Sequence, residues 1–280
     1  NSICITDEIQ KRNCVLKIPS LEPRSMKIVT WNVNGIRAVA KKGFSKFIES
    51  FDPDILCLQE TKAHRDQLSP KAIRDWNRFT QFCSGRRKGY SGVATLTKQV
   101  PDQVIKGFGV KKFDWEGRVL QTVQDGFTLY NIYFPNGGSG EERHQYKQEF
   151  LRKLNRHLKM ELAQGKSIVV VGDYNVAYMA EDVYDPKGLA NESGFLREER
   201  EWFNDFLELG FVDTFRHFHL SQKNKFTWWS YKENPRITNR GWRIDHICIS
   251  EDLLPRLKSC DILDDVEGSD HCPVIMEMES

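Results

Sequence analysis

The chain has 280 residues, of which 39% are hydrophobic and 29% charged, a balance that is typical of a globular protein and excludes extended disorder. Lys and Arg number 41 against 39 Asp and Glu, so the formal net charge of +2 gives no global attraction to nucleic acid or to membranes. An anionic partner would therefore have to bind at a local patch. The seven cysteines include no C-x-x-C pair, which predicts buried thiols in a reducing compartment rather than a disulfide framework.

The first strand-like run begins at Met26, and residues 1–25 lack the apolar core of a signal peptide. We expect residues 1–25 to be an N-terminal extension or an appended remnant. Residues 26–280 contain no linker and no repeat, so we expect them to form a single domain. Because no apolar run reaches membrane-spanning length, the sequence predicts an intracellular protein, cytoplasmic if its source is prokaryotic, with no membrane partner and a monomeric state.

Short apolar strands alternate with helical stretches along the chain. The dipeptide Asp125-Gly126 predicts a tight turn and hence an antiparallel hairpin over residues 119–134. Hairpins combined with helices that follow strands predict mixed sheets covered by helices, which is an α/β layered sandwich. Strands are expected at 26–32, 54–58, 92–97, 118–123, 127–134, 167–171, 227–231, 243–250 and 273–278, and helices at about 36–51, 141–164 and 196–209.

Polar side chains follow four of the expected strands or turns, in the segments WNVNG, LQETK, GDYN and GSDHCP. Each segment alone is more often a turn or a cap than a site. If they converge, their carboxylate and amide oxygens would suit Mg²⁺ or Mn²⁺, whereas zinc fits poorly because no thiolate or paired-histidine spacing is present. The residues concerned are Asn32, Asn34, Glu60, Asp173, Asn175, Asp270 and His271.

Asp245 lies in the alternating segment RIDHICIS and is a candidate buried acid. A buried carboxylate needs a partner, and His271 would serve, because the acid would fix the orientation of the imidazole and favour its charged form. The alternative is a surface ion pair with Arg243.

Two stretches, residues 86–112 and 223–243, are locally basic and interleaved with glycines and aromatic residues. Cationic side chains neutralise phosphates, and exposed rings can stack on bases or sugars, so both stretches are candidate nucleic-acid contacts. A solvated charged face over a Trp-rich core explains the composition equally well.

Taken in order, the segments WNVNGIRA, DILCLQETK, GYSGVA, YFPNG, GDYNVA, DTFR, TWWSY, NRGWRIDH and GSDHCP make the chain similar to the exonuclease III family of abasic-site endonucleases, within the wider endonuclease/exonuclease/phosphatase superfamily. The resemblance covers about residues 26–280. It implies a four-layer α/β sandwich in which two mixed sheets pack face to face between helices, with residues 26–280 as the catalytic domain. It also implies hydrolysis of a DNA phosphodiester 5′ to an abasic site, dependent on Mg²⁺ with Mn²⁺ as a substitute, together with 3′-to-5′ exonuclease and 3′-phosphodiesterase activity. The implied partner is double-stranded DNA that contains abasic sites or 3′ ends.

The same resemblance implies roles for individual residues. Glu60 matches the main metal ligand, with Asn32, Asn34 and Asp270 beside it and Asp173, Asn175 and His271 completing the candidate ligand set. Asp173 also matches the carboxylate that positions or deprotonates the attacking water, and Asn175 matches the amide that orients that water. His271, with Asp245 as its partner, matches the histidine on the scissile phosphate. Tyr133 matches the active-site tyrosine. The implied DNA-binding residues are Trp228, Trp242 and Ile244, which form a pocket for the abasic sugar, and Lys62, Arg86, Lys88, Tyr90 and Asn136.

Three departures from the family pattern bear on the balance of activities. Tyr178 stands where many relatives have a histidine, Asn34 where some have Asp, and the loop 138–140 lacks the longer side chain that some relatives insert into DNA.

Three alternative functions also remain open. The chain could be a lipid phosphatase, sphingomyelinase or DNase I-like nuclease of the same superfamily, a catalytically silent DNA-binding module, or a glycosidase that uses Glu60 and Asp173 as its carboxylate pair.

Overall fold

The computed structural model describes residues 25–230 and 236–280, so residues 1–24 of the expected N-terminal extension lie outside it. The described residues form two sheets of six strands each. In the first sheet the order is β11-β12-β1-β2-β4-β3, and in the second it is β5-β6-β7-β8-β10-β9. The strands are β1 (Ser25–Asn32), β2 (Ile55–Gln59), β3 (Phe79–Cys83), β4 (Val93–Thr97), β5 (Gln103–Lys106), β6 (Val119–Gln124), β7 (Phe127–Tyr133), β8 (Ile168–Asp173), β9 (Phe211–Asp213), β10 (Asp245–Ser250), β11 (Leu257–Ile262) and β12 (Val274–Glu279).

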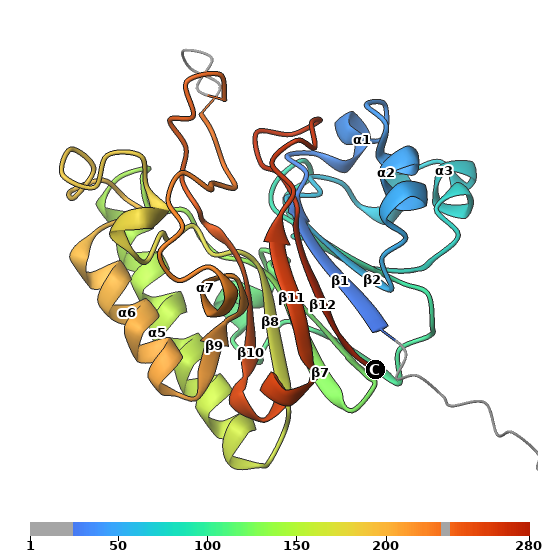
Figure 1. The fold of residues 1–280 in the computed structure, drawn as a ribbon. Coiled ribbons are helices and arrows are strands. Elements are labelled where there is room, and N and C mark those ends of the chain that lie inside the picture. Colours follow the sequence, from blue (N-terminus) through green and yellow to red (C-terminus); the bar gives the residue numbers. More distant parts are fainter. Residues whose placement is uncertain (1–24, 231–235) are drawn as a thin grey trace, which may run out of the picture.

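Helices cover the outer faces of both sheets (Figure 1). The long helices α5 and α6 pack on the second sheet, and α1, α2 and α3 lie over the first. The helices are α1 (Ile36–Val39), α2 (Phe44–Phe51), α3 (Pro70–Asp75), α4 (Lys111–Asp114), α5 (Glu141–Ala163), α6 (Arg197–Glu208) and α7 (Thr214–Phe218), with short 3₁₀ helices at Arg65–Gln67, Ala180–Asp182 and Glu251–Arg256.

Each sheet is mixed, because β1 pairs with β2 and β7 pairs with β8 in parallel, whereas the other neighbours are antiparallel. The expected hairpin is present as β6 and β7, whose register pairs Gln124 with Phe127. The expected four-layer α/β sandwich of two mixed sheets is therefore confirmed.

The side chains of β1 alternate between two apolar layers, as the pleat of a strand requires. Ile28 points into the layer between the sheets, where it joins Leu129, Val171 and Ile247. Trp31 points the other way, into the layer under α1, α2 and α3. A strand with both faces buried has no polar face, which explains why segments such as 55–58 read as continuous apolar runs.

The long helix expected at 141–164 is observed as α5, with Phe150, Leu151, Leu154 and Leu158 buried. The single helix expected over about 36–51 is instead divided into α1 and α2. Gly43 precedes α2 with a φ of 95°, a left-handed conformation that breaks the helix.

The strand expected at 227–231 is wrong for residues 227–230, and Tyr231 lies outside the described residues. The backbone N–H groups of Thr227 and Trp228 both donate to the carbonyl oxygen of Trp242. In addition, Thr227 Oγ1 accepts hydrogen bonds from the N–H groups of Ile244 and Asp245, at 3.0 Å each. Because a side-chain oxygen replaces a ladder carbonyl, the segment makes only isolated bridges.

Five of the cysteines lie among the described residues, and all five are free and buried, as expected: Cys57, Cys83, Cys248, Cys260 and Cys272. Among the described residues, no helix has the length and apolar character needed to cross a bilayer.

Candidate active site

The candidate site residues gather at one end of the sandwich, opposite the end where Ser25 pairs with Glu279. Sheet register brings several of them together. Asp173, the last residue of β8, is flanked by Asp245 on antiparallel β10 and by Tyr133 on parallel β7. The carboxyl ends of the parallel strands β1 and β2 also lie side by side, with Asn32 paired with Gln59. Glu60 follows Gln59 and therefore lies close to Asn32. The topology thus converts separate sequence segments into one cluster.

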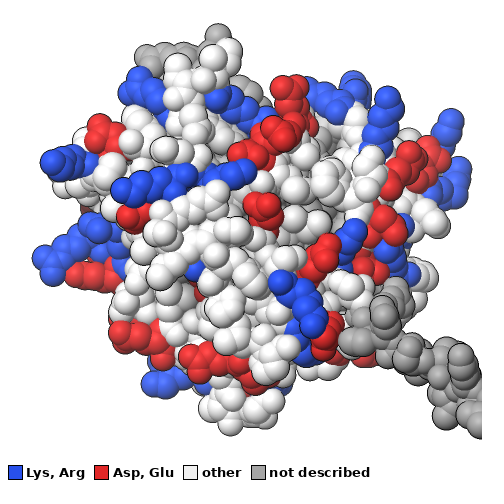
Figure 2. All heavy atoms as spheres, viewed as in Figure 1, with Lys and Arg blue, Asp and Glu red and all other residues white. Residues whose placement is uncertain are grey.

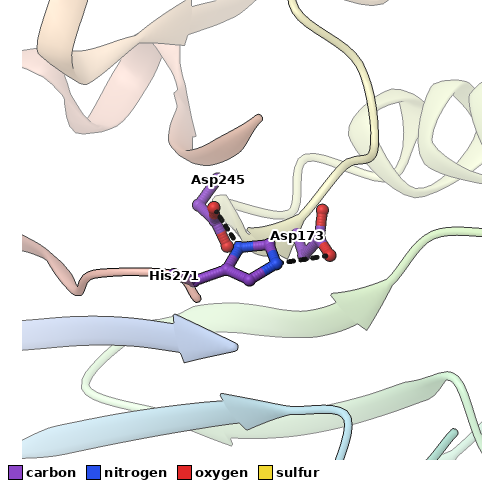
Figure 3. A group of neighbouring side chains, drawn as sticks. All are labelled: Asp173, Asp245 and His271. Carbon is purple, nitrogen blue, oxygen red and sulfur yellow. Dashed lines mark hydrogen bonds and ion pairs between the residues drawn. The ribbon is translucent and has the colours of Figure 1, made fainter. Parts of the chain in front are cut away.

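Asp173, His271 and Asp245 form the centre of this cluster, with the imidazole between the two carboxylates (Figure 3). His271 Nδ1 lies 2.8 Å from Asp245 Oδ2, and His271 Nε2 lies 3.9 Å from Asp173 Oδ2. All three side chains are buried. The alternative pairing of Asp245 with Arg243 is not observed, because Arg243 binds Asp182 and Asp213 instead.

The environment shifts the pKa values of both Asp173 and His271 upward. Burial, reinforced by the nearby charge of Asp245, raises the pKa of Asp173 to about 7. Burial opposes the charged form of His271, but the carboxylates of Asp245 and Asp173 outweigh it and raise the pKa of His271 to about 10. At neutral pH the histidine is therefore a cation, and Asp173 is a carboxyl group able to take up a proton.

Two asparagines hold the Asp173 carboxylate. Asn32 Nδ2 donates to Asp173 Oδ2 at 2.8 Å, and the backbone N–H of Asn175 donates to Asp173 Oδ1 at 2.8 Å. Asn175 has a φ of 52°, a left-handed conformation that asparagine tolerates better than most residues. Its amide oxygen accepts a hydrogen bond from Asn136 Nδ2 at 3.0 Å. Asn136 is exposed, and its amide therefore connects the surface to the buried Asn175.

A second group of oxygen ligands adjoins the first. Asn32 Nδ2 lies 3.3 Å from Glu60 Oε1, and Asn34 Nδ2 donates to Asp270 Oδ1 at 2.9 Å. The ammonium of Lys62 lies between Glu60, at 2.8 Å from Oε2, and the amide oxygen of Asn34. A cationic group thus already occupies the space between these oxygens.

The oxygen-only donor set fits a hard divalent cation. Burial opposes ionisation of Glu60, but Lys62 lowers its pKa overall, so this carboxylate is available as a ligand. Burial likewise opposes ionisation of Asp270, and the nearby His271 lowers its pKa overall. Asp173, Asp245 and His271 also present ligand atoms within 4.8 Å of one another, although His271 is already engaged by Asp245.

Tyr133 borders this second group. Burial and the charge of Glu60 raise the pKa of Tyr133 well above its usual range, so its hydroxyl stays protonated. The guanidinium of Arg118 lies 4.8 Å from the centre of the Tyr133 ring.

The apolar residues expected to form a sugar pocket lie next to this centre. The Trp228 ring is 6.3 Å from the ring of His271 and 6.3 Å from that of Trp242. Trp228 Nε1 donates to Asp270 Oδ2 at 3.2 Å, which ties this wall to the oxygen ligands. Trp242 and Ile244 belong to a small buried cluster with Phe195.

The remaining expected DNA contacts lie on the rim. Arg86 packs its guanidinium on the ring of Trp115, Lys88 is exposed, and the hydroxyl of Tyr90 accepts a hydrogen bond from Arg118 at 2.8 Å. Lys62 is the exception, because it is paired inside the site rather than presented on the rim.

Two buried cationic neighbours of the site, Lys147 and Arg118, were missed by sequence reasoning. Lys147, on α5, is fully buried and donates to the carbonyl oxygen of Asn175 at 2.8 Å while pairing with Glu199. Arg118 connects Tyr90 to Tyr133. The sequence carries no signal for these roles, because each depends on contacts between distant segments.

Comparison with known proteins gives consistent results. Residues 29–271 match the model of the endonuclease/exonuclease/phosphatase family. The chain is 42% identical to a Bacillus subtilis exodeoxyribonuclease, over 89% of this chain and 98% of the relative. It is 37% identical to a Dictyostelium discoideum DNA-(apurinic or apyrimidinic site) endonuclease, over 91% of this chain and 71% of the relative. The solved structure of an AP endonuclease from Archaeoglobus fulgidus superposes with a TM-score of 0.83 at 30% identity, covering 91% of this chain and all of that one (100%).

Proposed function

The chain belongs to the endonuclease/exonuclease/phosphatase family, and on that premise we propose that it is a DNA-repair nuclease that hydrolyses the phosphodiester 5′ to an abasic site in a Mg²⁺-dependent reaction. We propose further that it acts on 3′ ends, as an exonuclease and a 3′-phosphodiesterase, and that it works as a monomer. Relatives named for both exodeoxyribonuclease and abasic-site endonuclease activity support this range of substrates.

The observation that carries the proposal is the alignment of Asp173, His271 and Asp245. Hydrolysis of a phosphodiester needs a group that accepts the proton of water and a cation that stabilises charge on the phosphate oxygens. Asp173 is suited to the first task because its pKa is about 7. His271 is suited to the second, because Asp245 lies 2.8 Å from Nδ1 and leaves Nε2 directed toward Asp173.

The amides around Asp173 orient the reacting groups. Asn32 and Asn175 hold its carboxylate through the hydrogen bonds described above, and Asn175 is itself held by Asn136 and Lys147. Because these groups are fixed before substrate binds, little reorganisation is needed in the transition state. The Tyr133 hydroxyl, which stays protonated, can donate a hydrogen bond to a phosphate oxygen.

Glu60, Asn34 and Asp270 would hold Mg²⁺, with Mn²⁺ as a substitute. When bound there, the ion supplies a Lewis acid that neutralises charge on the phosphate and on the leaving oxygen. Lys62 would have to leave the space between Glu60 and Asn34 for a cation to enter, and its partly exposed side chain could then turn toward a DNA phosphate.

The wall formed by Trp228, Trp242 and Ile244 is proposed to receive the extruded abasic sugar. A missing base lowers the cost of extrusion, and a small apolar pocket excludes a normal nucleotide. The buried Phe195 packs edge-on against Trp242, with ring centres 6.4 Å apart, and belongs to the same cluster.

The test is cleavage of a labelled duplex with one abasic-site analogue, in Mg²⁺ or in EDTA, beside matched nicked and recessed duplexes. We expect incision 5′ to the lesion in Mg²⁺ only, and the relative rates on the three substrates would give the order of activities. Tight DNA binding without cleavage of any substrate would instead indicate a silent binding module, and absence of both would contradict the proposal.

A further inference from the structure

A hollow of about 500 Å³ lies beside the candidate active site and plays no part in the chemistry proposed above. We call it the Arg–Trp hollow. Its main lining residues come from three separated segments of the chain: Arg86, Arg87, Tyr90, Trp115, Ser139 and Arg143.

The Arg–Trp hollow is cationic. Glu116 is its one acidic lining residue, and that carboxylate is already bound by Arg118, at 2.5 Å, and by Arg143, at 3.3 Å. Within residues 25–230 and 236–280, neither Arg86 nor Arg87 forms an ion pair with a carboxylate. Two guanidinium groups are therefore available to phosphates.

The hollow is built by close packing of two loops. A Cβ atom on Gly117 would lie 2.3 Å from the backbone nitrogen of Gly85, and one on Gly85 would lie 2.6 Å from the carbonyl oxygen of Glu116. The backbone N–H of Arg86 also donates to the carbonyl oxygen of Trp115 at 3.0 Å. The two glycines thus allow a contact that fixes Arg86 against Trp115.

Trp115 provides an aromatic surface within this cationic setting. Its side chain is 44% exposed, although large aromatic residues are usually well buried. The guanidinium of Arg86 lies 4.1 Å from the ring centre and Lys111 Nζ lies 5.1 Å from it. An exposed ring flanked by cations is the combination that binds single-stranded nucleic acid, in which bases stack on rings and cations hold the backbone.

A short chain of contacts connects the hollow to the candidate active site. The Tyr90 hydroxyl accepts hydrogen bonds from Arg118 at 2.8 Å and from Arg143 at 3.3 Å. Arg118 in turn packs on Tyr133, which borders Glu60. These contacts link the hollow to the candidate active site through Arg118.

Resting on the proposed function, we propose that the Arg–Trp hollow is a subsite for an unpaired nucleotide of the substrate, in which Trp115 stacks on the base and Arg86 and Arg87 bind its phosphate. Ser139 keeps the hollow open because its side chain is short. Such a subsite favours frayed or mismatched 3′ ends over fully paired ones, since a paired base is not free to stack on the protein.

The test compares two recessed duplexes that differ only in whether the last 3′ nucleotide is paired or mismatched, with affinity measured by fluorescence anisotropy in EDTA. We expect the wild type to bind the mismatched end more tightly. Trp115→Ala should remove this preference, with a loss of roughly tenfold for the mismatched end, which is the size of one base–ring stack. Trp115→Phe should retain most of the preference.

Two further variants control for folding and for general effects. Trp115→Leu keeps apolar bulk without an extended ring and should behave as Trp115→Ala, so it replaces that variant if the alanine chain does not fold. Phe218→Ala removes another exposed ring, 41% exposed on α7, and should leave both affinities unchanged.

The possible outcomes separate the two proposals. Equal affinity of the wild type for both ends, or equal losses on both ends for Trp115→Ala, would overturn the subsite while cleavage of the abasic duplex in Mg²⁺ would leave the nuclease function in place. Absence of any DNA binding would overturn both.

Discussion

Individual residues in the site owe their properties to neighbours rather than to their own chemistry. Asp173 and Asp245 are the same residue type, and each ends or begins a strand of the second sheet. Asp173 is held by amides and has a raised pKa, whereas Asp245 lies against the charged imidazole of His271. Asp173 is therefore suited to accept a proton, and Asp245 is suited to orient the His271 cation.

The role assigned to His271 predicts a large effect on turnover and a small effect on binding. We expect His271→Ala to lower kcat on abasic duplex by about 10²–10⁴, because the cation acts mainly on charge that develops in the transition state. Affinity in EDTA should change by less than about threefold. His217→Ala, at an exposed position on α7, is the matched control. Parallel losses of affinity and of kcat would contradict the assignment.

The short side chain of Ser139 leads to a prediction about DNA affinity: a longer, charged residue at this position should strengthen binding. Ser139 lines the Arg–Trp hollow in a loop that lacks a long side chain. We expect Ser139→Arg to tighten binding to abasic duplex or to slow product release, since an added cation gains a contact with the DNA backbone. Kd and burst kinetics would measure this, and Ser139→Gln, which adds length without charge, is the control. An unchanged Kd together with an unchanged release rate would refute the prediction.

At the scale of elements, helices α5 and α6 reach the site through a buried ion pair. Lys147 and Glu199 are both fully buried, and Glu199 Oε2 also accepts hydrogen bonds from the backbone N–H groups of Gly194 and Leu196. Burial lowers the pKa of Lys147 in spite of the attraction of Glu199. The pair thus connects two helices, the loop behind Trp242 and the carbonyl oxygen of Asn175.

Removing one partner of this pair should be costly. We expect Lys147→Met to lower the free energy of unfolding by about 3–5 kcal/mol, because Glu199 would remain buried without its counter-charge. Urea denaturation would measure the change. Lys112→Met, which breaks the exposed pair with Glu149, should cost less than about 1 kcal/mol. Adding Glu199→Gln to Lys147→Met should restore part of the loss, and a double variant less stable than the single one would argue against this account.

Sequence reasoning found the long helices and the central strands and missed the strands at the sheet edges. The strands β3, β5, β9 and β11 were not expected, and they are the four edge strands of the two sheets, each beside a single partner. Burial patterns at such edges are weak, as in β5, where no residue is buried. The segment 227–230 was expected to be a strand and is not one. Its composition is strand-like, but the Thr227 hydroxyl takes the hydrogen bonds that a neighbouring strand would make.

At the scale of the whole molecule, a buried network of charges joins the loop after β8 to β9 and β10. Arg243 binds Asp182 at 2.7 Å and Asp213 at 2.7 Å, and Arg216 also pairs with Asp182. Burial alone would raise the pKa values of both carboxyls, but the arginines outweigh it and lower them. The folded state therefore binds these protons less readily than the unfolded chain.

This network predicts a loss of stability in acid. Both carboxyls have folded pKa values below the unfolded value of about 3.9, so their contribution is fully present above that pH and is lost as pH falls through the lower folded values. We expect the free energy of unfolding to fall below about pH 4, and Asp213→Asn to make that dependence shallower while lowering stability at neutral pH. Denaturant unfolding between about pH 2 and 7 would show it, with exposed Asp205→Asn as control. A slope in Asp213→Asn equal to that of the wild type would contradict the role of Asp213.

The sequence by itself determined the fold class and the residue types of the site, because alternating apolar runs, turn dipeptides and ordered motifs are local properties of the chain. The pairing of Asp245 with His271 was also predictable, since a buried acid needs a partner. Only the tertiary structure decided which other side chains meet: Lys62 between Glu60 and Asn34, Lys147 under Asn175, and Arg86 on Trp115. These contacts join segments far apart in the chain, and their geometry depends on sheet register and loop packing, which no local pattern encodes.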